Sequence, residues 1–137
     1  MSGERAKILL IDDDIDFVRA TVKVLESRPD YQVIVAYNGQ EGLEKACQEK
    51  PDVILLDIIM PLGDGFSVCE KLRQDSAFDD TPILMITSFS ERYGETSLAV
   101  SQGRTLEAED YIDKPVRPAE LFRRIDKQLA KKRRKEA

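Results

Sequence analysis

Two short apolar runs that end in aspartate constrain the fold more than any other feature of this chain. Val53–Leu56 leads directly into Asp57, and Ile8–Ile11 leads directly into Asp12. Four consecutive apolar residues of this kind indicate a strand that is buried on both faces, as in a parallel sheet covered by helices. An aspartate at the end of such a strand lies at the edge of the sheet where open α/β folds bind ligands.

The two runs predict a cluster of carboxylates if their strands are neighbours. Asp13 and Asp14 follow Asp12, so three or more carboxylates would crowd one edge together with Asp57. Like charges at such short range are unfavourable unless a cation or a proton neutralises them. A divalent metal ion, together with an electrophile such as phosphate, would satisfy this cluster.

Strand and helix patterns alternate five times along the chain. Strands are predicted at 7–12, 32–36, 53–57, 82–87 and 111–113, and helices at 14–27, 38–50, 66–72, within 88–106 and at 118–129. This alternation predicts an α/β fold with a parallel sheet, right-handed crossovers and helices on both faces. We expect a single domain over residues 1–137, with a core of about 6–130, a basic tail at 131–137 and no output module.

Composition excludes several classes of function. The chain has no histidine and only two cysteines, Cys47 and Cys69, without CxxC spacing. A zinc site and a histidine-dependent triad are therefore excluded, and we expect both cysteines to be reduced core residues of helices. No apolar stretch is long enough to span a membrane, and residues 1–7 lack a signal-peptide core. We therefore expect a cytoplasmic protein without membrane insertion.

Charge is distributed unevenly along the chain. The net charge is −5, but residues 127–137 hold six basic residues against one acidic residue, so residues 1–126 carry −10. An acidic body is a poor surface for nucleic acid and a good one for a cation. We expect residues 131–135 to form a solvated helix end whose cations suit the helix dipole, the alternative being a docking arm for an acidic partner or anionic surface.

Side chains at the strand ends supply what phosphoryl transfer to a carboxylate needs, namely positioning, a metal ion and donors for the phosphoryl oxygens. Asp57 is the candidate nucleophile, on the middle strand. Thr87 ends the fourth predicted strand, where its hydroxyl would donate to a phosphoryl oxygen. Lys114 follows the fifth, where its ammonium would neutralise first Asp57 and then the phosphoryl group.

Asp12 and Asp13 are the candidate magnesium ligands, Asp13 directly and Asp12 through a water molecule. Asp57 and the backbone carbonyl of Ile59 would complete the site, since Mg²⁺ keeps several waters and uses few carboxylates. We expect Asp14 to cap the following helix instead. Each residue alone has an ordinary structural explanation, but their joint placement at successive strand ends argues for a site.

Five motifs, in a fixed order, carry a resemblance to a known family. They are Ile8-Leu9-Leu10-Ile11-Asp12-Asp13, Val53-Ile54-Leu55-Leu56-Asp57, Met60-Pro61 with Asp64-Gly65, Ile86-Thr87 and Asp110-Tyr111-Ile112-Asp113-Lys114-Pro115. With them the chain resembles a response-regulator receiver domain of two-component signalling, the stand-alone chemotaxis-type regulator being the simplest relative. The resemblance covers residues 6 to about 130. It implies a flavodoxin-like, doubly wound five-stranded sheet of order 2-1-3-4-5 with the site at its switch point.

The resemblance also implies how the site works. Asp57 would accept a phosphoryl group, with Mg²⁺, from a phosphohistidine of a sensor histidine kinase or a histidine phosphotransfer protein. The Lys114–Pro115 bond would be cis. Thr87 and Tyr111 would form a switch pair, in which Thr87 moves toward the phosphoryl group and the Tyr111 ring turns inward to change a protein-binding surface. The alternative for Tyr111 is a half-buried aromatic residue of an edge strand.

We therefore expect a phosphorylation-controlled signalling protein that is not an enzyme, promoting only its own phosphorylation and dephosphorylation. It would contact a downstream protein target or relay the phosphoryl group to a second histidine, without binding nucleic acid. One alternative is a haloacid-dehalogenase-like phosphatase with Asp12 as nucleophile and Asp14 as general acid, although Ile15 stands where that family has Thr or Val. Another is a degenerate receiver that never accepts phosphate.

Two apolar residues predict slow loss of the phosphoryl group. Ile59 and Phe89 lie two residues past Asp57 and Thr87, where a polar side chain could orient water. We expect both to slow hydrolysis of the aspartyl phosphate, so that Ile59→Asn shortens its lifetime.

Overall fold

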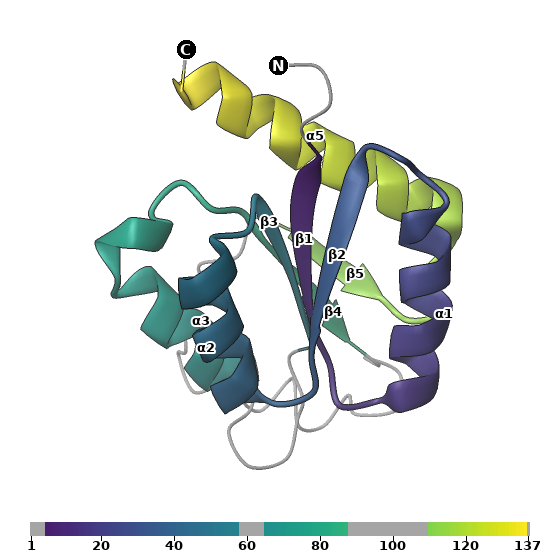
Figure 1. The fold of residues 1–137 in the computed structure, drawn as a ribbon, viewed down its shortest axis with the longest axis horizontal. Coiled ribbons are helices and arrows are strands. Elements are labelled where there is room, and N and C mark those ends of the chain that lie inside the picture. Colours follow the sequence, from purple (N-terminus) through teal and green to yellow (C-terminus); the bar gives the residue numbers. More distant parts are fainter. Residues whose placement is uncertain (1–4, 58–64, 88–109, 137) are drawn as a thin grey trace.

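Five parallel strands form one sheet in the order β2-β1-β3-β4-β5 (Figure 1). The computed structural model describes residues 5–57, 65–87 and 110–136. The strands are β1 Ala6–Ile11, β2 Tyr31–Ala36, β3 Val53–Asp57, β4 Ile83–Thr87 and β5 Asp110–Asp113. The helices are α1 Ile15–Glu26, α2 Gly39–Glu49, α3 Gly65–Arg73 and α5 Pro118–Glu136, with a 3-10 turn, η1, at Ser76–Phe78.

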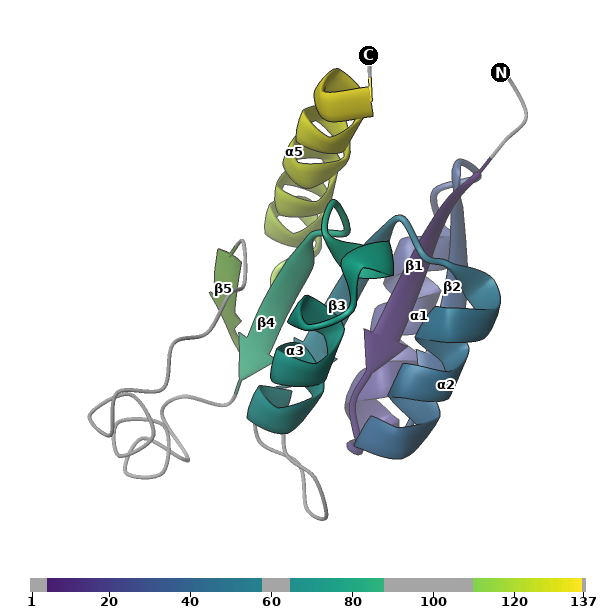
Figure 2. The same cartoon turned by 90° about the vertical axis from the view of Figure 1, so that its left-hand side faces the viewer.

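Helices cover both faces of the sheet, α2 and α3 on one face and α1 and α5 on the other (Figures 1 and 2). Successive strand residues point to opposite faces, so each strand contributes to two cores. Leu9, Ile54 and Met85 belong to the core beneath α2 and α3. Leu10 and Leu55 belong to the core beneath α1 and α5. The predicted doubly wound fold and its strand order are confirmed.

The predicted helix starts are confirmed at both α1 and α2. Asp14 caps α1, where its carboxylate accepts a hydrogen bond from the Phe17 backbone N–H at 3.1 Å. Asn38 caps α2, where its side chain accepts from the Glu41 N–H at 2.8 Å. The Glu41 carboxylate reaches back to accept from the Tyr37 N–H at 2.7 Å, which satisfies a second backbone donor.

One detail differs from the sequence-based expectations. Cys69 is buried, but Cys47 is exposed on α2, so its prediction as a core residue is wrong. It follows the buried Ala46, and one residue turns a helix by about 100° away from the core. The helix predicted at 118–129 continues to Glu136 and includes residues 131–135, which were expected to form its end, because Ala, Lys and Arg are strong helix formers.

Some expectations fall on parts of the chain without a described structure. The helix predicted within 88–106 lies outside the described residues, and so do Ile59 and Phe89. Within the described ranges, no helix combines the length and the apolar character that crossing a membrane requires.

Candidate functional site

Asp12 and Asp57 lie side by side at the carboxyl edge of the sheet. Ile11 on β1 pairs with Leu56 on β3, so the next residue of each strand stands at the same level. Asp12 is fully buried and Asp57 is only 5% exposed. One carboxylate oxygen from each of Asp12, Asp13 and Asp57 lies within 4.8 Å of the others. The predicted cluster of carboxylates therefore exists.

Backbone contacts hold the acidic loop, residues Asp12–Asp14, in place. The Asp12 N–H donates to the Ala36 carbonyl at 3.1 Å, which extends the pairing of β1 with β2 by one residue. Asp12 Oδ1 accepts from the Asp14 N–H at 2.9 Å, and Asp14 in turn caps α1. The expected capping role of Asp14 is therefore confirmed, while the metal-binding roles of Asp12 and Asp13 stay predictions.

Lys114 brings a cation into this cluster from the end of β5. Its Nζ lies 2.9 Å from Asp12 Oδ2 and 4.0 Å from Asp57 Oδ2, and its side chain is 12% exposed. The Phe17 ring of α1 also contacts the ammonium, with its centroid 4.1 Å from Nζ. The Lys114–Pro115 bond is cis, as the resemblance implied. The structure thus joins Lys114 to Asp12 and Asp57 of this cluster.

The donor set fits a divalent cation. Three carboxylates face one ammonium, so negative charge remains in excess among these four side chains. Among the described residues, Asp12 Oδ2 is a buried side-chain oxygen without a hydrogen bond of regular geometry. Its contact is the ion pair with the Lys114 ammonium. Closely spaced carboxylate oxygens are the ligands that Mg²⁺ uses. Asp12, Asp13 and Asp57 could therefore hold this ion.

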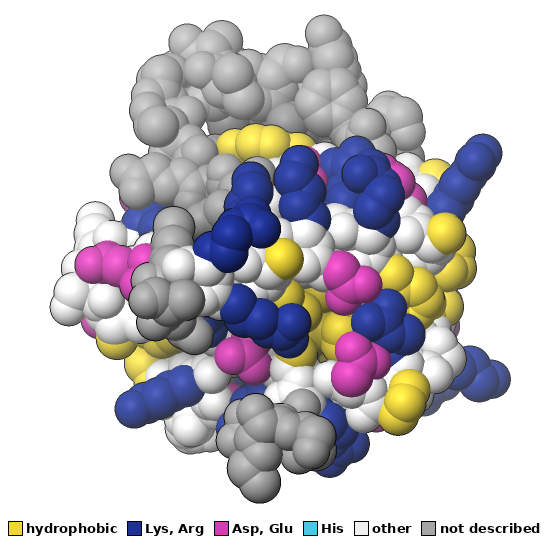
Figure 3. Space-filling model, turned by 90° about the horizontal axis from the view of Figure 1, so that it is seen from above, with side chains coloured by type: hydrophobic (Ala, Val, Ile, Leu, Met, Phe, Trp, Pro, Cys, Tyr) yellow, Lys and Arg dark blue, Asp and Glu magenta, His cyan; other side chains and the backbone are white. Residues whose placement is uncertain are grey.

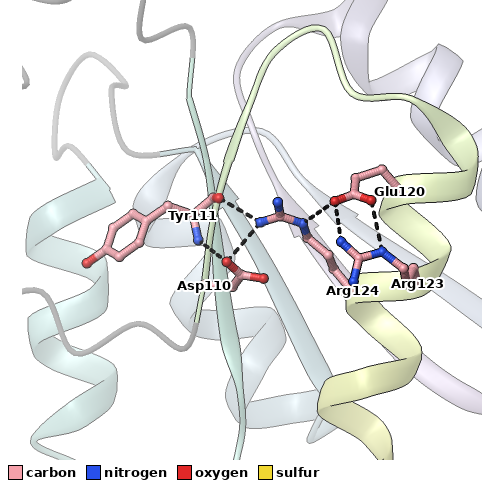
Figure 4. Close-up of polar contacts among 5 residues, drawn as sticks. All are labelled: Asp110, Tyr111, Glu120, Arg123 and Arg124. Atoms are coloured by element: carbon pink, nitrogen blue, oxygen red, sulfur yellow. Dashed lines mark hydrogen bonds and ion pairs between the residues drawn. The ribbon is translucent and has the colours of Figure 1, made fainter.

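The two predicted switch residues lie on the neighbouring strands. Thr87 ends β4 and its backbone pairs with Asp113 of β5, but its side chain is outside the described part. Tyr111 of β5 is 48% exposed, and its ring points away from α5 (Figure 4). The structure therefore brings the two strands together and has the tyrosine in an outward position.

Sequence reasoning missed Arg124, which links β5 to α5. Its guanidinium donates to Asp110 Oδ1, to the Tyr111 carbonyl and to Glu120 Oε1, each at 2.9 Å (Figure 4). Hydrogen bonds from Arg123 and Arg124 lower the pKa of Glu120 to about 2. The i,i+3 and i,i+4 spacing from Glu120 signals the pairs within the helix. The contacts with Asp110 and Tyr111 have no local signal, because they join separate elements.

The basic end of α5 lies at the other end of the molecule from the site. Lys132 Nζ lies 3.3 Å from the carboxylate of Asp52, which precedes β3, whereas Asp57 ends that strand. Arg133 and Arg134 are exposed. Figure 3 shows many Lys and Arg side chains on this face, with Asp and Glu between them. The two arginines are thus exposed, while Lys132 is paired, and the role of residues 131–135 stays a prediction.

Comparison with known proteins identifies the arrangement. Residues 8–126 match the family model described as the response regulator receiver domain. The chain belongs to this family. Receiver domains of two-component response regulators are phosphorylated on an aspartate with Mg²⁺ and interact with histidine kinases. The haloacid-dehalogenase alternative is not supported.

Several relatives of known sequence or structure are similar to this receiver domain. The alkaline phosphatase synthesis transcriptional regulatory protein PhoP of Bacillus subtilis is 41% identical over 119 residues, which cover 87% of this chain and 46% of that protein. Chemotaxis protein CheY4 of Vibrio cholerae is 30% identical, with a TM-score of 0.76 and coverage of 90% of this chain and 98% of that one. The chain spans about half the length of the curated transcriptional regulators that it matches.

A second similar structure has a metal ion. The receiver domain of the sensor histidine kinase PA1611 of Pseudomonas aeruginosa is 25% identical, with a TM-score of 0.80, and covers 92% of this chain and 98% of its own. It was solved with a magnesium ion coordinated in its active-site cleft.

Proposed function

We propose that this receiver domain accepts a phosphoryl group on Asp57 from a phosphohistidine of a sensor histidine kinase or a histidine phosphotransfer protein. The observation that carries the proposal is the convergence of Asp12, Asp13 and Asp57 within 4.8 Å, with the Lys114 ammonium between two of them. Phosphoryl transfer needs positioning and charge compensation more than covalent help from the protein. These four side chains supply both.

The surroundings of the two buried carboxylates favour Asp57 over Asp12 as the acceptor. Asp12 is fully buried, its Oδ1 accepts from the Asp14 N–H, and its Oδ2 contacts Lys114. Asp57 ends the middle strand, lies 4.0 Å from the same ammonium and retains a small exposed area. It is therefore the better placed nucleophile.

The proposed step is a displacement at phosphorus. A carboxylate oxygen of Asp57 forms the new P–O bond while the P–N bond to the donor histidine breaks, and the imidazole nitrogen keeps the electron pair. Lys114 compensates the charge of the phosphoryl oxygens, and the Thr87 hydroxyl is the proposed donor to one of them. Asp12, Asp13, Asp57 and the Ile59 carbonyl would hold Mg²⁺, which when bound would supply further charge compensation.

The proposed output is a change of surface. Thr87 would move toward the phosphoryl group and Tyr111, now 48% exposed, would turn inward. The changed surface would contact a downstream protein target, or the phosphoryl group would pass to a second histidine. The proposal assigns no other substrate and no nucleic-acid contact to this receiver domain, and it includes the cytoplasmic location expected from the sequence.

Phosphorylation with a small donor tests this proposal. The protein is incubated with acetyl phosphate and Mg²⁺, and its intact mass is measured. We expect one phosphate-sized, base-labile adduct, which disappears in Asp57→Asn and when EDTA removes the metal. Asp52→Asn is the matched control, because Asp52 lies just before the same strand at the opposite end. An adduct that persists in Asp57→Asn would contradict the proposal.

A further inference from the structure

We propose that Phe17 is a positioning residue for phosphoryl transfer, because its ring holds the Lys114 ammonium on the side of Asp12 and Asp57. The contact that carries this inference is the 4.1 Å separation between Lys114 Nζ and the centroid of the Phe17 ring. A cation over an aromatic face within about 6 Å is attracted by the ring quadrupole. The inference rests on the proposed function of Asp57.

Phe17 is itself firmly held. It lies in the first turn of α1, where its backbone N–H donates to the capping carboxylate of Asp14 at 3.1 Å. Its partly buried side chain packs against the core between the sheet and the helices α1 and α5. The acidic loop therefore helps to place both partners of the contact. Asp12 contacts the Lys114 ammonium, and Asp14 caps the helical turn that carries the Phe17 ring.

The ammonium is enclosed by groups of different kinds. Asp12 Oδ2 lies 2.9 Å from Nζ, Asp57 Oδ2 lies 4.0 Å away, and the Lys114 side chain is only 12% exposed. A cation that has lost most of its water needs compensation from each side. The ring provides this compensation without a formal negative charge. A third carboxylate on the same side would instead compete with the incoming phosphoryl oxygens for the cation.

A series of fluorinated phenylalanines at position 17 tests the role of the ring face. Fluorine withdraws electron density from the ring and weakens its attraction for a cation while the shape changes little. The residues are phenylalanine, 4-fluoro-, 3,5-difluoro- and 3,4,5-trifluorophenylalanine, and the measured quantity is the rate constant for phosphorylation by acetyl phosphate at saturating Mg²⁺. We expect a stepwise fall of about fivefold in total, which corresponds to a cation–π contribution of about 1 kcal/mol.

Two further comparisons separate positioning from mere packing. The same series at Phe122 of α5, whose ring lies beneath the Arg28 guanidinium, should leave the rate unchanged. Phe17→Tyr should keep the wild-type rate within about twofold, whereas Phe17→Leu should match the trifluorinated protein. In NMR spectra, the ε-CH₂ protons of Lys114 should show an upfield ring-current shift that Phe17→Leu abolishes.

The outcomes distinguish this inference from the proposed function. If wild-type protein takes no phosphate on Asp57, the proposed function fails, and the positioning role fails with it. If wild-type protein is phosphorylated but the rate is equal across the position-17 series, only the role of Phe17 is overturned. An unshifted Lys114 resonance in the wild-type protein would likewise overturn it.

Discussion

The ammonium nitrogen of Lys114 lies 2.9 Å from Asp12 Oδ2, so a cation of the protein already occupies one side of a proposed metal ligand. The same nitrogen is 4.0 Å from Asp57 Oδ2. Lys114 and Mg²⁺ therefore attract the same carboxylate and repel each other. The site balances affinity for the metal against the charge compensation that Lys114 gives to the phosphoryl group.

Removing the ammonium should strengthen magnesium binding. We predict that Lys114→Met raises the Mg²⁺ affinity of the unphosphorylated protein about tenfold, since it removes a positive charge next to the metal ligands. Isothermal titration calorimetry measures this. Lys132→Met is the control, because Lys132 pairs with Asp52 at the other end of β3. An unchanged or weaker affinity in Lys114→Met would show that the ammonium and the metal do not compete.

Replacing Gly42 on α2 by a larger residue should destabilise the protein. A Cβ at this position would lie 2.6 Å from Ile11 Cδ1 and 3.0 Å from Ile11 Cγ1, and Ile11 is fully buried. Alanine gains about 1 kcal/mol of helix propensity over glycine, but overpacking a core costs about 1–3 kcal/mol. We predict that Gly42→Ala lowers the free energy of unfolding in urea, whereas Glu44→Ala, on the exposed side of α2, changes little.

A second substitution checks that this loss comes from the clash. Ile11→Val removes the Cδ1 atom and alone costs about 0.5–1.5 kcal/mol. The loss of the double variant with Gly42→Ala should be clearly smaller than the sum of the two single losses, because the shorter valine makes room for the added Cβ. Fully additive losses would mean that the close approach of α2 to β1 is not the cause.

Tyr31 should make stability depend on pH in the alkaline range. Its ring is buried, its hydroxyl donates to Asp126, and Arg28 stacks over the ring at 4.6 Å. Burial, followed by the bond to Asp126, raises the pKa of Tyr31 above its ordinary value. The folded protein thus keeps a proton that the unfolded chain releases at about pH 10. The contribution of this hydroxyl is therefore complete below that pH and is lost as the pH rises above it.

We accordingly predict that Tyr31→Phe is less stable than wild type by about 0.5–1.5 kcal/mol at pH 7, and that this difference shrinks above about pH 10. Urea unfolding at several pH values measures both quantities. Tyr37→Phe serves as the control, since Tyr37 is exposed. A difference that stays constant between pH 7 and 10.5 would contradict the prediction.

Arg124 should not be replaceable by lysine. Its guanidinium serves Asp110, the Tyr111 carbonyl and Glu120 at once, which a single ammonium cannot reproduce (Figure 4). We predict that Arg124→Lys lowers the free energy of unfolding by about 1 kcal/mol and speeds hydrogen exchange of the β5 amides. Arg123→Lys should change stability by less than about 0.5 kcal/mol, because Arg123 is exposed. Equal effects of the two substitutions would refute the special role of Arg124.

Much of the fold could be predicted from the sequence, because its main signals are local. The runs Ile8–Ile11 and Val53–Leu56 are buried strands, and the aspartates that follow them meet because parallel strands end at one edge. The contact of Phe17 with Lys114 could not be predicted, since it joins residues far apart in the chain by side-chain geometry. The sequence predicts Cys47 as a core residue, but it is exposed, because a buried neighbour does not determine which side of the helix a residue faces.

Identification of the phosphorylated residue tests the central claim most directly. The protein is phosphorylated by acetyl phosphate or a purified histidine kinase, reduced with borohydride, which converts an aspartyl phosphate to homoserine, and digested for peptide mass spectrometry. We predict homoserine at position 57 and unmodified aspartate at positions 12, 13 and 14. Homoserine at position 12, with Asp57 unmodified, would contradict the account and make Asp12 the nucleophile.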